Sequence, residues 1–493
     1  MGPGLRRDTA STRVAARAAR AWAPVAALLA LSASAARAQA RDSLVYQVTI
    51  QPTAARAEVE ARLRMRPGSV VALDAPASTG GAGTSVTSIA GWDGGGRTLD
   101  LRKTATGYSV VLGPDGVVRL HYALAFLHGV PDGSTAAGLD TVHLYAGTRG
   151  LFVAPDPTAL RKTATHYPAV TVRMTAPPGW RVVSGWPDDD AGLHPGGGDE
   201  LLGGTLAAAA DFRLYEGAVG TARWRVAVRG RRYFADSTLV RAVDAGLASG
   251  AATLGPVPVP LVTYTADLGR KGRMSGSLQG TASIGLVWEP SEILARARKH
   301  DLFHETLHLW FGGVMVTERW WTEGVTDYVA ARLLSTSIGT PDDLAYLCFQ
   351  SLRNYQAIGH RTRYSMAEES RLGLAGDNTE LLVYRKGMLA GLMLDAELRR
   401  SSHGTRSLDD LSRELLAVAA HRGTRRVSEA EIRDSAIALG GEEMRAVWDR
   451  VVAGTSLLTE GDVVSALRDV TGRTFPVPVL EAKRRKTFRA AAP

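Results

Sequence analysis

The chain has 493 residues, of which 45% are hydrophobic and 22% charged, and its formal net charge is +9. At roughly 100–200 residues per domain, this length predicts two to four domains of ordinary globular composition. The composition excludes a disordered chain, a collagen-like rod and a small disulfide-stapled scaffold. Because the positive charge would suit nucleic acid or a membrane surface, its position along the chain decides whether such a partner is expected.

The first forty residues have the pattern of a secretory signal peptide. Residues 1–40 carry six arginines and one acid, and they contain an apolar run from Ala21 to Leu31 that is too short to span a membrane. The small residues at 38–40 predict cleavage before Arg41, with cleavage after Ala38 as the alternative. Removing this segment lowers the net charge from +9 to +4, so no nucleic-acid partner is expected. We expect a mature chain without a membrane span, located in the periplasm or secreted.

The cysteine content shows whether a disulfide can form within the chain. Cys348 is the single cysteine and stands in the apolar context Leu347-Cys348-Phe349. An intrachain disulfide is therefore excluded, and we expect a buried core residue.

Residues 41–232 predict a β-sandwich-like antiparallel domain. Short runs of alternating apolar and polar residues, such as Val45 to Ile50, are separated by clusters of Gly, Pro and Asp. The histidines of this half show no ligand spacing, so no catalytic group is expected in it.

From Tyr233 the pattern changes to helical periodicity, interrupted by two β-like stretches at 257–264 and 283–288. Helices are expected over 291–311, 322–336, 341–357, 380–399, 407–420, 428–439 and 441–453. This pattern predicts an α+β multidomain fold. We divide the second half into a catalytic domain at 233–340, a helical domain at 341–475 and a basic tail at 476–493.

The segment His304-Glu305-Thr306-Leu307-His308 is the strongest functional signal in the sequence. Residues four apart share one face of a helix, so both imidazoles can reach a single Zn²⁺ ion. Glu305 would then lie beside the open position of the metal, where a carboxylate can accept a proton from water.

A catalytic zinc site needs a third protein ligand, and the candidate is Glu323 in Trp320-Trp321-Thr322-Glu323-Gly324. Asp327 lies one turn later on the same face and could orient a ligating histidine through its far nitrogen. The alternative is that both are solvated acids in the first turn of a helix. His300 lies one turn before His304 and is expected at the surface or behind the ligands.

These motifs, together with Val383-Tyr384-Arg385-Lys386-Gly387, resemble the gluzincin metallopeptidases, which include the alanyl and leucyl aminopeptidases. The C-terminal half is most similar to the glycyl aminopeptidase family. The resemblance implies an N-terminal β domain, a thermolysin-like zinc-binding domain and a C-terminal α-helical domain.

The resemblance also implies the roles of individual residues. His304, His308 and Glu323 would hold one zinc ion, Glu305 would be the general base, and Tyr384 would donate to the oxyanion. The implied substrate is a peptide. Fourteen residues separate His308 from Glu323, against eighteen usual in the aminopeptidases, so a shorter loop is expected beside the site.

The substrate-binding strand of the family is matched here by Gly276-Ser277-Leu278-Gln279-Gly280. Aminopeptidases of this kind hold the free amine with a Glu, whereas Gln279 offers no countercharge. Two alternatives to an aminopeptidase therefore stay open: a zinc endopeptidase or other amide hydrolase without strict N-terminal selection, and a catalytically silent binding protein. The oligomeric state is left open.

Overall fold

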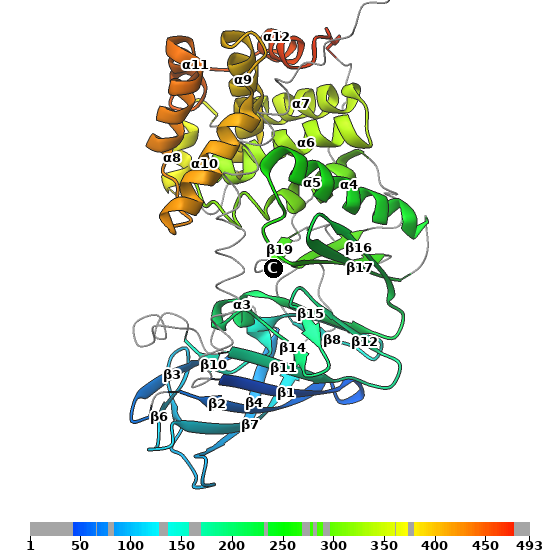
Figure 1. Cartoon of the computed structure of the whole chain (residues 1–493), viewed down its shortest axis with the longest axis vertical. Helices are drawn as coiled ribbons and strands as arrows, with labels where there is room; N and C mark the ends of the chain where they lie inside the picture. The colour runs from blue at the N-terminus through cyan, green and yellow to red at the C-terminus, as the bar shows by residue number, and fades with distance from the viewer. Residues whose placement is uncertain are drawn as a thin grey trace, which may run out of the picture. The chain divides into compact units, whose positions relative to one another are not determined.

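The computed structural model describes residues 43–477, apart from 66, 77–82, 128–136, 157–168, 231–234, 269–276, 280–282, 289–295, 360 and 373–378. The expected signal peptide at 1–40 and nearly all of the basic tail lie outside the described residues. The chain forms two compact units, one of residues up to Arg213 with Gln279–Ser283, and one of Leu214–Leu278 with the residues from Ile284 onward. Figure 1 shows the strands of the first unit in blue to blue-green and the helices of the second from green to red.

The first unit contains three sheets. The largest has the strand order β13-β14-β11-β1-β2-β7-β4, the second β10-β3-β6-β5 and the third β12-β15-β9-β8. The strands of the first sheet are β1 (Ser43–Gln51), β2 (Arg56–Arg64), β4 (Thr84–Trp92), β7 (Val117–Phe126), β11 (Ala169–Thr175), β13 (Asp188–Asp189) and β14 (Gly192–Leu193). The others are β3 (Val70–Asp74), β5 (Arg102–Lys103), β6 (Gly107–Val111), β8 (Gly138–Leu139), β9 (His143–Gly147), β10 (Ala154–Pro155), β12 (Arg181–Ser184) and β15 (Thr205–Ala209). The described residues of this unit also form the short helices η1 (Pro52–Ala54), η3 (Thr148–Gly150) and α3 (Gly198–Gly203).

The alternation in the sequence produces the buried face of this unit. Strand β1 buries every second residue, including Leu44, Tyr46 and Val48, and the same period continues in β2 and β7. One pairing differs from the expected antiparallel arrangement, because β1 pairs with β11 in parallel. A parallel neighbour needs a long connection, and more than a hundred residues separate the two strands, so local periodicity could not indicate it.

The second unit begins with a five-stranded sheet of order β16-β17-β18-β20-β19. Its strands are β16 (Arg213–Val219), β17 (Ala222–Gly230), β18 (Leu261–Leu268), β19 (Ser277–Gln279) and β20 (Ser283–Trp288). Helix α4 (Asp236–Leu254) connects β17 to β18, which run parallel. The sheet thus joins strands from both sides of the expected boundary between 232 and 233, and β16 and β17 belong with the zinc-binding half.

The remaining helices follow this sheet. They are α5 (Arg296–Leu307), the π-helical turn η4 (Trp320–Val325), α6 (Thr326–Ser337), α7 (Pro341–Gln356), α8 (Met366–Leu372), α9 (Thr379–Ser401), α10 (Leu408–Arg422), α11 (Glu429–Val451) and α12 (Glu460–Thr471). Capping boxes begin four of them, at Thr340, Ser407, Ser428 and Thr459. No helix in the described part of the chain has the length and apolar content needed to cross a bilayer.

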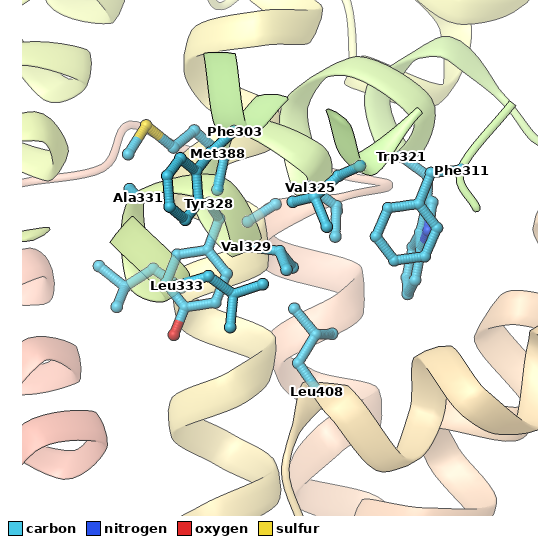
Figure 2. Packing of buried hydrophobic residues seen from close by; sticks show 14 of the residues in the cluster. Phe303, Phe311, Trp321, Val325, Tyr328, Val329, Ala331, Leu333, Met388 and Leu408 are labelled. Atoms are coloured by element: carbon cyan, nitrogen blue, oxygen red, sulfur yellow. The ribbon is translucent and has the colours of Figure 1, made fainter. Parts of the chain in front are cut away.

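One hydrophobic core holds the helices of the second unit together. Phe303 of α5, Tyr328 of α6 and Met388 of α9 belong to the same buried cluster and are labelled in Figure 2. Cys348 of α7 lies in this core as a free thiol, as expected from its apolar context. The helices that carry the predicted site residues are therefore fixed to one another by apolar packing.

Candidate metal centre

Helix α5 presents the two histidines of the HExxH motif side by side. The helix ends at Leu307, and the backbone N–H of His308 still donates to the carbonyl of His304, so the four-residue spacing is retained. The two imidazole rings lie 4.6 Å apart between centroids and are nearly perpendicular, at 88°. Leu302, Phe303 and Leu307 of this helix are buried in the core.

Glu323 comes to these histidines from the turn η4. One of its carboxylate oxygens lies 3.4 Å from His304 Nε2 and 3.5 Å from His308 Nε2. Burial opposes ionisation of this carboxyl, but contacts with the two imidazoles outweigh it and hold the pKa of Glu323 below its usual range. Turns of π type occur frequently at functional sites. In η4, Glu323 follows the buried Trp320 and Trp321 and precedes the start of α6.

The donor set fits zinc. One ligand atom each from His304, His308 and Glu323 lie within 4.8 Å of one another, and among the residues that the structure describes this is the one such cluster. Two imidazole nitrogens with one carboxylate oxygen are the ligands of a catalytic zinc site with an open fourth position.

Partners behind the ligands fix their ring orientation. His308 Nδ1 lies 2.9 Å from the carbonyl oxygen of Phe311, which can only accept, so Nδ1 carries the proton and Nε2 is free to bind a metal. His304 Nδ1 lies 2.8 Å from Asp327 Oδ1. Both histidines therefore turn Nε2 toward Glu323.

Asp327 is a buried acid with partners on both α5 and α9. It is 5% exposed, its backbone carbonyl lies 2.8 Å from His300 Nε2, and its Oδ2 lies 3.7 Å from Arg385 Nη1. Burial alone would raise the pKa of Asp327, but His304, His300 and Arg385 lower it, so the carboxylate is ionised at neutral pH. His300 is buried behind the ligands rather than at the surface. Arg385 was not singled out by the sequence, although it adjoins Tyr384.

We expect Asp327→Asn to weaken zinc binding about 10–100-fold, because the amide removes the negative charge that His304 Nδ1 faces. The measurement is the zinc dissociation constant, obtained by equilibrium competition with a chelator. Asp301→Asn is the matched control, since Asp301 is on α5 and lies 3.2 Å from Arg298 and 3.8 Å from His300, neither of which is among the three ligands. Equal zinc affinities for the two variants would contradict an orienting role for Asp327.

Tyr384 of α9 lies beside His304. Its ring centroid is 6.2 Å from that of His304, at an interplanar angle of 27°. Burial and the neighbouring carboxylate of Glu323 raise the pKa of Tyr384 well above its usual value. The phenol therefore stays protonated and can donate a hydrogen bond.

The connection between His308 and Glu323 is a short, tied loop. Gly312 and Met315 are hydrogen-bonded across it, and Val316 pairs with the segment 425–427 just before α11. The Arg425 guanidinium also donates to the carbonyl oxygen of Gly312 at 2.6 Å. These contacts hold the loop whose Phe311 carbonyl orients His308.

The predicted substrate strand is described only in part. Gly276 lies outside the described residues, and Gln279 ends β19, at the edge of the five-stranded sheet. The side chain of Gln279 lies outside the described part of the chain.

Comparison with known proteins gives a fold relationship. No protein-family model matches the chain, and no curated protein matches its sequence. Among solved structures, an aminopeptidase N family protein from Idiomarina loihiensis aligns with a TM-score of 0.73 and 16% identity over 86% of this chain and 78% of that one.

Two further structures align over a similar share of the chain. A variant of an M1 zinc metallopeptidase from Deinococcus radiodurans bound to a Tyr-Ser-Ala substrate aligns with a TM-score of 0.53 and 15% identity, covering 85% of this chain and 94% of that one. Yeast LTA4 hydrolase aligns with a TM-score of 0.51 and 13% identity, covering 85% and 68%. The chain therefore has the multidomain α+β fold of the M1 zinc metallopeptidases.

Proposed function

We propose that the protein is an exported, zinc-dependent metallopeptidase that hydrolyses peptide bonds in the manner of an aminopeptidase. The observation that carries the proposal is the convergence of His304, His308 and Glu323, whose ligand atoms lie within 4.8 Å of one another. The fold agrees with this function, and one neighbour of the same fold is described with a peptide substrate. Export rests on the signal-peptide pattern of residues 1–40.

The three ligands would hold the zinc ion, which when bound polarises a carbonyl group and lowers the pKa of water. Glu305, next in sequence to His304, takes a proton from the attacking water and passes it to the amine of the breaking peptide bond. Tyr384 donates its phenolic hydrogen to the oxygen on which negative charge develops. Asp327 and the carbonyl of Phe311 keep the two imidazoles in the orientation that presents Nε2.

The surroundings of Glu305 suit a group that exchanges protons. Burial raises its pKa above the usual carboxyl value, while His304 and His308 partly offset that rise. A raised pKa lies closer to neutral pH, so the carboxylate can both accept a proton and later release it.

The first test is zinc content together with peptide cleavage. We expect the purified protein to bind one zinc ion per chain and to cleave a short peptide with a free N-terminus, with mass spectrometry locating the cleaved bond. A protein that binds no stoichiometric zinc under these conditions is the catalytically silent binder instead.

The second test separates an aminopeptidase from an endopeptidase. The same peptide is offered with a free and with an acetylated N-terminus, and we expect cleavage of the free form to be strongly preferred. Acetylation removes the charged amine, so an enzyme that selects N-termini loses a charge-assisted hydrogen bond. Equal rates for both peptides would favour the alternative, an endopeptidase or other amide hydrolase, which is consistent with a neutral Gln279.

A further inference from the structure

Helix α9 and the turn η4 cross with their backbones in contact at two glycines. A methyl group at Gly324 would lie 2.4 Å from the carbonyl oxygen of Val383 and 2.5 Å from the Cα atom of Gly387. A methyl group at Gly387 would lie 2.8 Å from the carbonyl oxygen of Trp320 and 2.9 Å from the Cα atom of Gly324. Since carbon atoms pack at about 3.5–4.0 Å, no side chain fits at either position.

Two of the residues in this contact are next in sequence to two groups of the metal centre, Glu323 and Tyr384. Gly324 directly follows Glu323, and the Val383 carbonyl that it touches belongs to the peptide bond preceding Tyr384. This backbone contact therefore joins the residue that follows the carboxylate to the residue that precedes the phenol. We propose that Gly324 and Gly387 are positioning residues, which set the separation between the metal ligand Glu323 and the phenol of Tyr384.

Other contacts prevent α9 from simply moving away from η4. On α9, the buried amine of Lys386 donates to the carbonyl of Gly454 at 2.7 Å, and the carbonyl of Arg385 accepts from Ser351 at 3.1 Å. One turn further on, Gly391 lies against Tyr328 of α6, where a methyl group would be 2.9 Å from the tyrosine Cβ. Helix α9 therefore contacts α6 and η4, and it is also hydrogen-bonded to α7 and to the segment that follows α11.

This role rests on the proposed function of Tyr384, and it gives a defined expectation for Gly387→Ala. The added methyl group must displace α9 or η4 by about 1 Å to reach an ordinary contact distance. A misplacement of about 1 Å between reacting groups can cost about 100-fold in rate, so we expect kcat at saturating zinc to fall about 10–100-fold. Gly324→Ala approaches the same contact from the other element and is expected to act similarly.

A double-mutant cycle with Tyr384→Phe distinguishes positioning from general damage. If the glycine acts through the phenol, Gly387→Ala should cause little further loss of kcat once the hydroxyl is absent. Losses that multiply in full would overturn the proposal. Gly246→Ala is the matched control, because Gly246 is also a buried helical glycine but a methyl there would lie 3.7 Å from its nearest neighbour, an ordinary contact.

A second readout does not depend on activity. Crystal structures of the metal-free wild type and of Gly387→Ala should show the distance between the Tyr384 oxygen and the Glu323 carboxylate increased by about 1 Å in the variant. An unchanged distance would overturn the positioning role. If the wild type cleaves no peptide, or Tyr384→Phe keeps full activity, the proposed function fails and this distance alone still decides the role of the glycines. Gly324→Ala takes the place of Gly387→Ala in both measurements if the latter does not fold.

Discussion

Glu305→Gln is expected to lower kcat for peptide hydrolysis about 10²–10⁴-fold while leaving zinc bound. Glutamine has nearly the shape of glutamate but accepts no proton at neutral pH, so the water loses its general base. Because Glu305 is not among the three clustered ligands, its neutralisation leaves the donor set of His304, His308 and Glu323 complete. The measurements are kcat on a free-amine peptide and zinc content per chain.

The wild type should also lose activity as the pH falls through the pKa of Glu305, because only the carboxylate accepts a proton. Burial raises that pKa in the metal-free site, whereas a zinc ion bound beside it would lower it. The fall in activity at low pH that is due to Glu305 should be absent from the pH–rate profile of the residual activity of Glu305→Gln. Full hydrolysis by this variant would contradict the proposed mechanism, whereas loss of zinc together with activity would mean that Glu305 holds the site together instead.

Tyr384→Phe is expected to lower kcat about 10²–10³-fold, equivalent to about 2.7–4 kcal/mol of transition-state stabilisation. The phenol is kept protonated by burial and by the Glu323 carboxylate, so its proton is available wherever negative charge develops nearby. Removing the hydroxyl leaves the aromatic ring in place beside His304, at the 6.2 Å centroid distance seen here. KM should change less than kcat, because the hydrogen bond is made mainly in the transition state.

Binding of a transition-state analogue gives an independent measure of the same interaction. A phosphorus-containing peptide analogue should lose affinity for Tyr384→Phe in proportion to the loss of kcat/KM, while a substrate-like peptide should not. Tyr364→Phe is the control, since that ring stacks with the Arg363 guanidinium and is not among the groups of the metal centre. Equal kcat for Tyr384→Phe and the wild type would remove Tyr384 from the catalytic residues.

Local patterns in the sequence were sufficient for the fold class and for most of the helical half. The predicted helix at 341–357 is α7, whose start is specified by the Thr340 capping box and by proline in its first turn. The expected break at residue 440 matches a change of direction inside α11, where Gly441 has φ 74°. The HExxH spacing likewise specifies a shared helix face, and the structure places both imidazoles there.

Other features depend on contacts that no local pattern encodes. The Glu323 helix begins as a π turn, although its sequence reads as an ordinary helix from Thr322. Helices α8 and α12 were not predicted, even though Thr459 and Asp462 form a capping box at the start of α12. Strands β16 and β17 alternate like those of the first unit, so their membership of the five-stranded sheet of the second unit follows only from the pairing of β17 with β18.

Within the site, the partners of Asp327 also include a contact that the local sequence does not predict. Its spacing from Glu323 placed it on the correct helix face, but the approach of Arg385 arises from the crossing of α9 and α6. The backbone of α9 also contacts the turn η4, which leads into α6, at Gly324 and Gly387, and in the sequence these are two of 53 glycines.

The tied loop between His308 and Glu323 links metal occupancy to folding. Because Val316 pairs with 425–427 and Arg425 reaches Gly312, the segment that leads into α11 is part of the scaffold around one zinc ligand. A ligand that binds only the folded state stabilises every element that must be folded for binding. Bound zinc would therefore stabilise the loop and the start of α11 together against local unfolding. These two segments, more than a hundred residues apart in sequence, would then unfold as one cooperative unit.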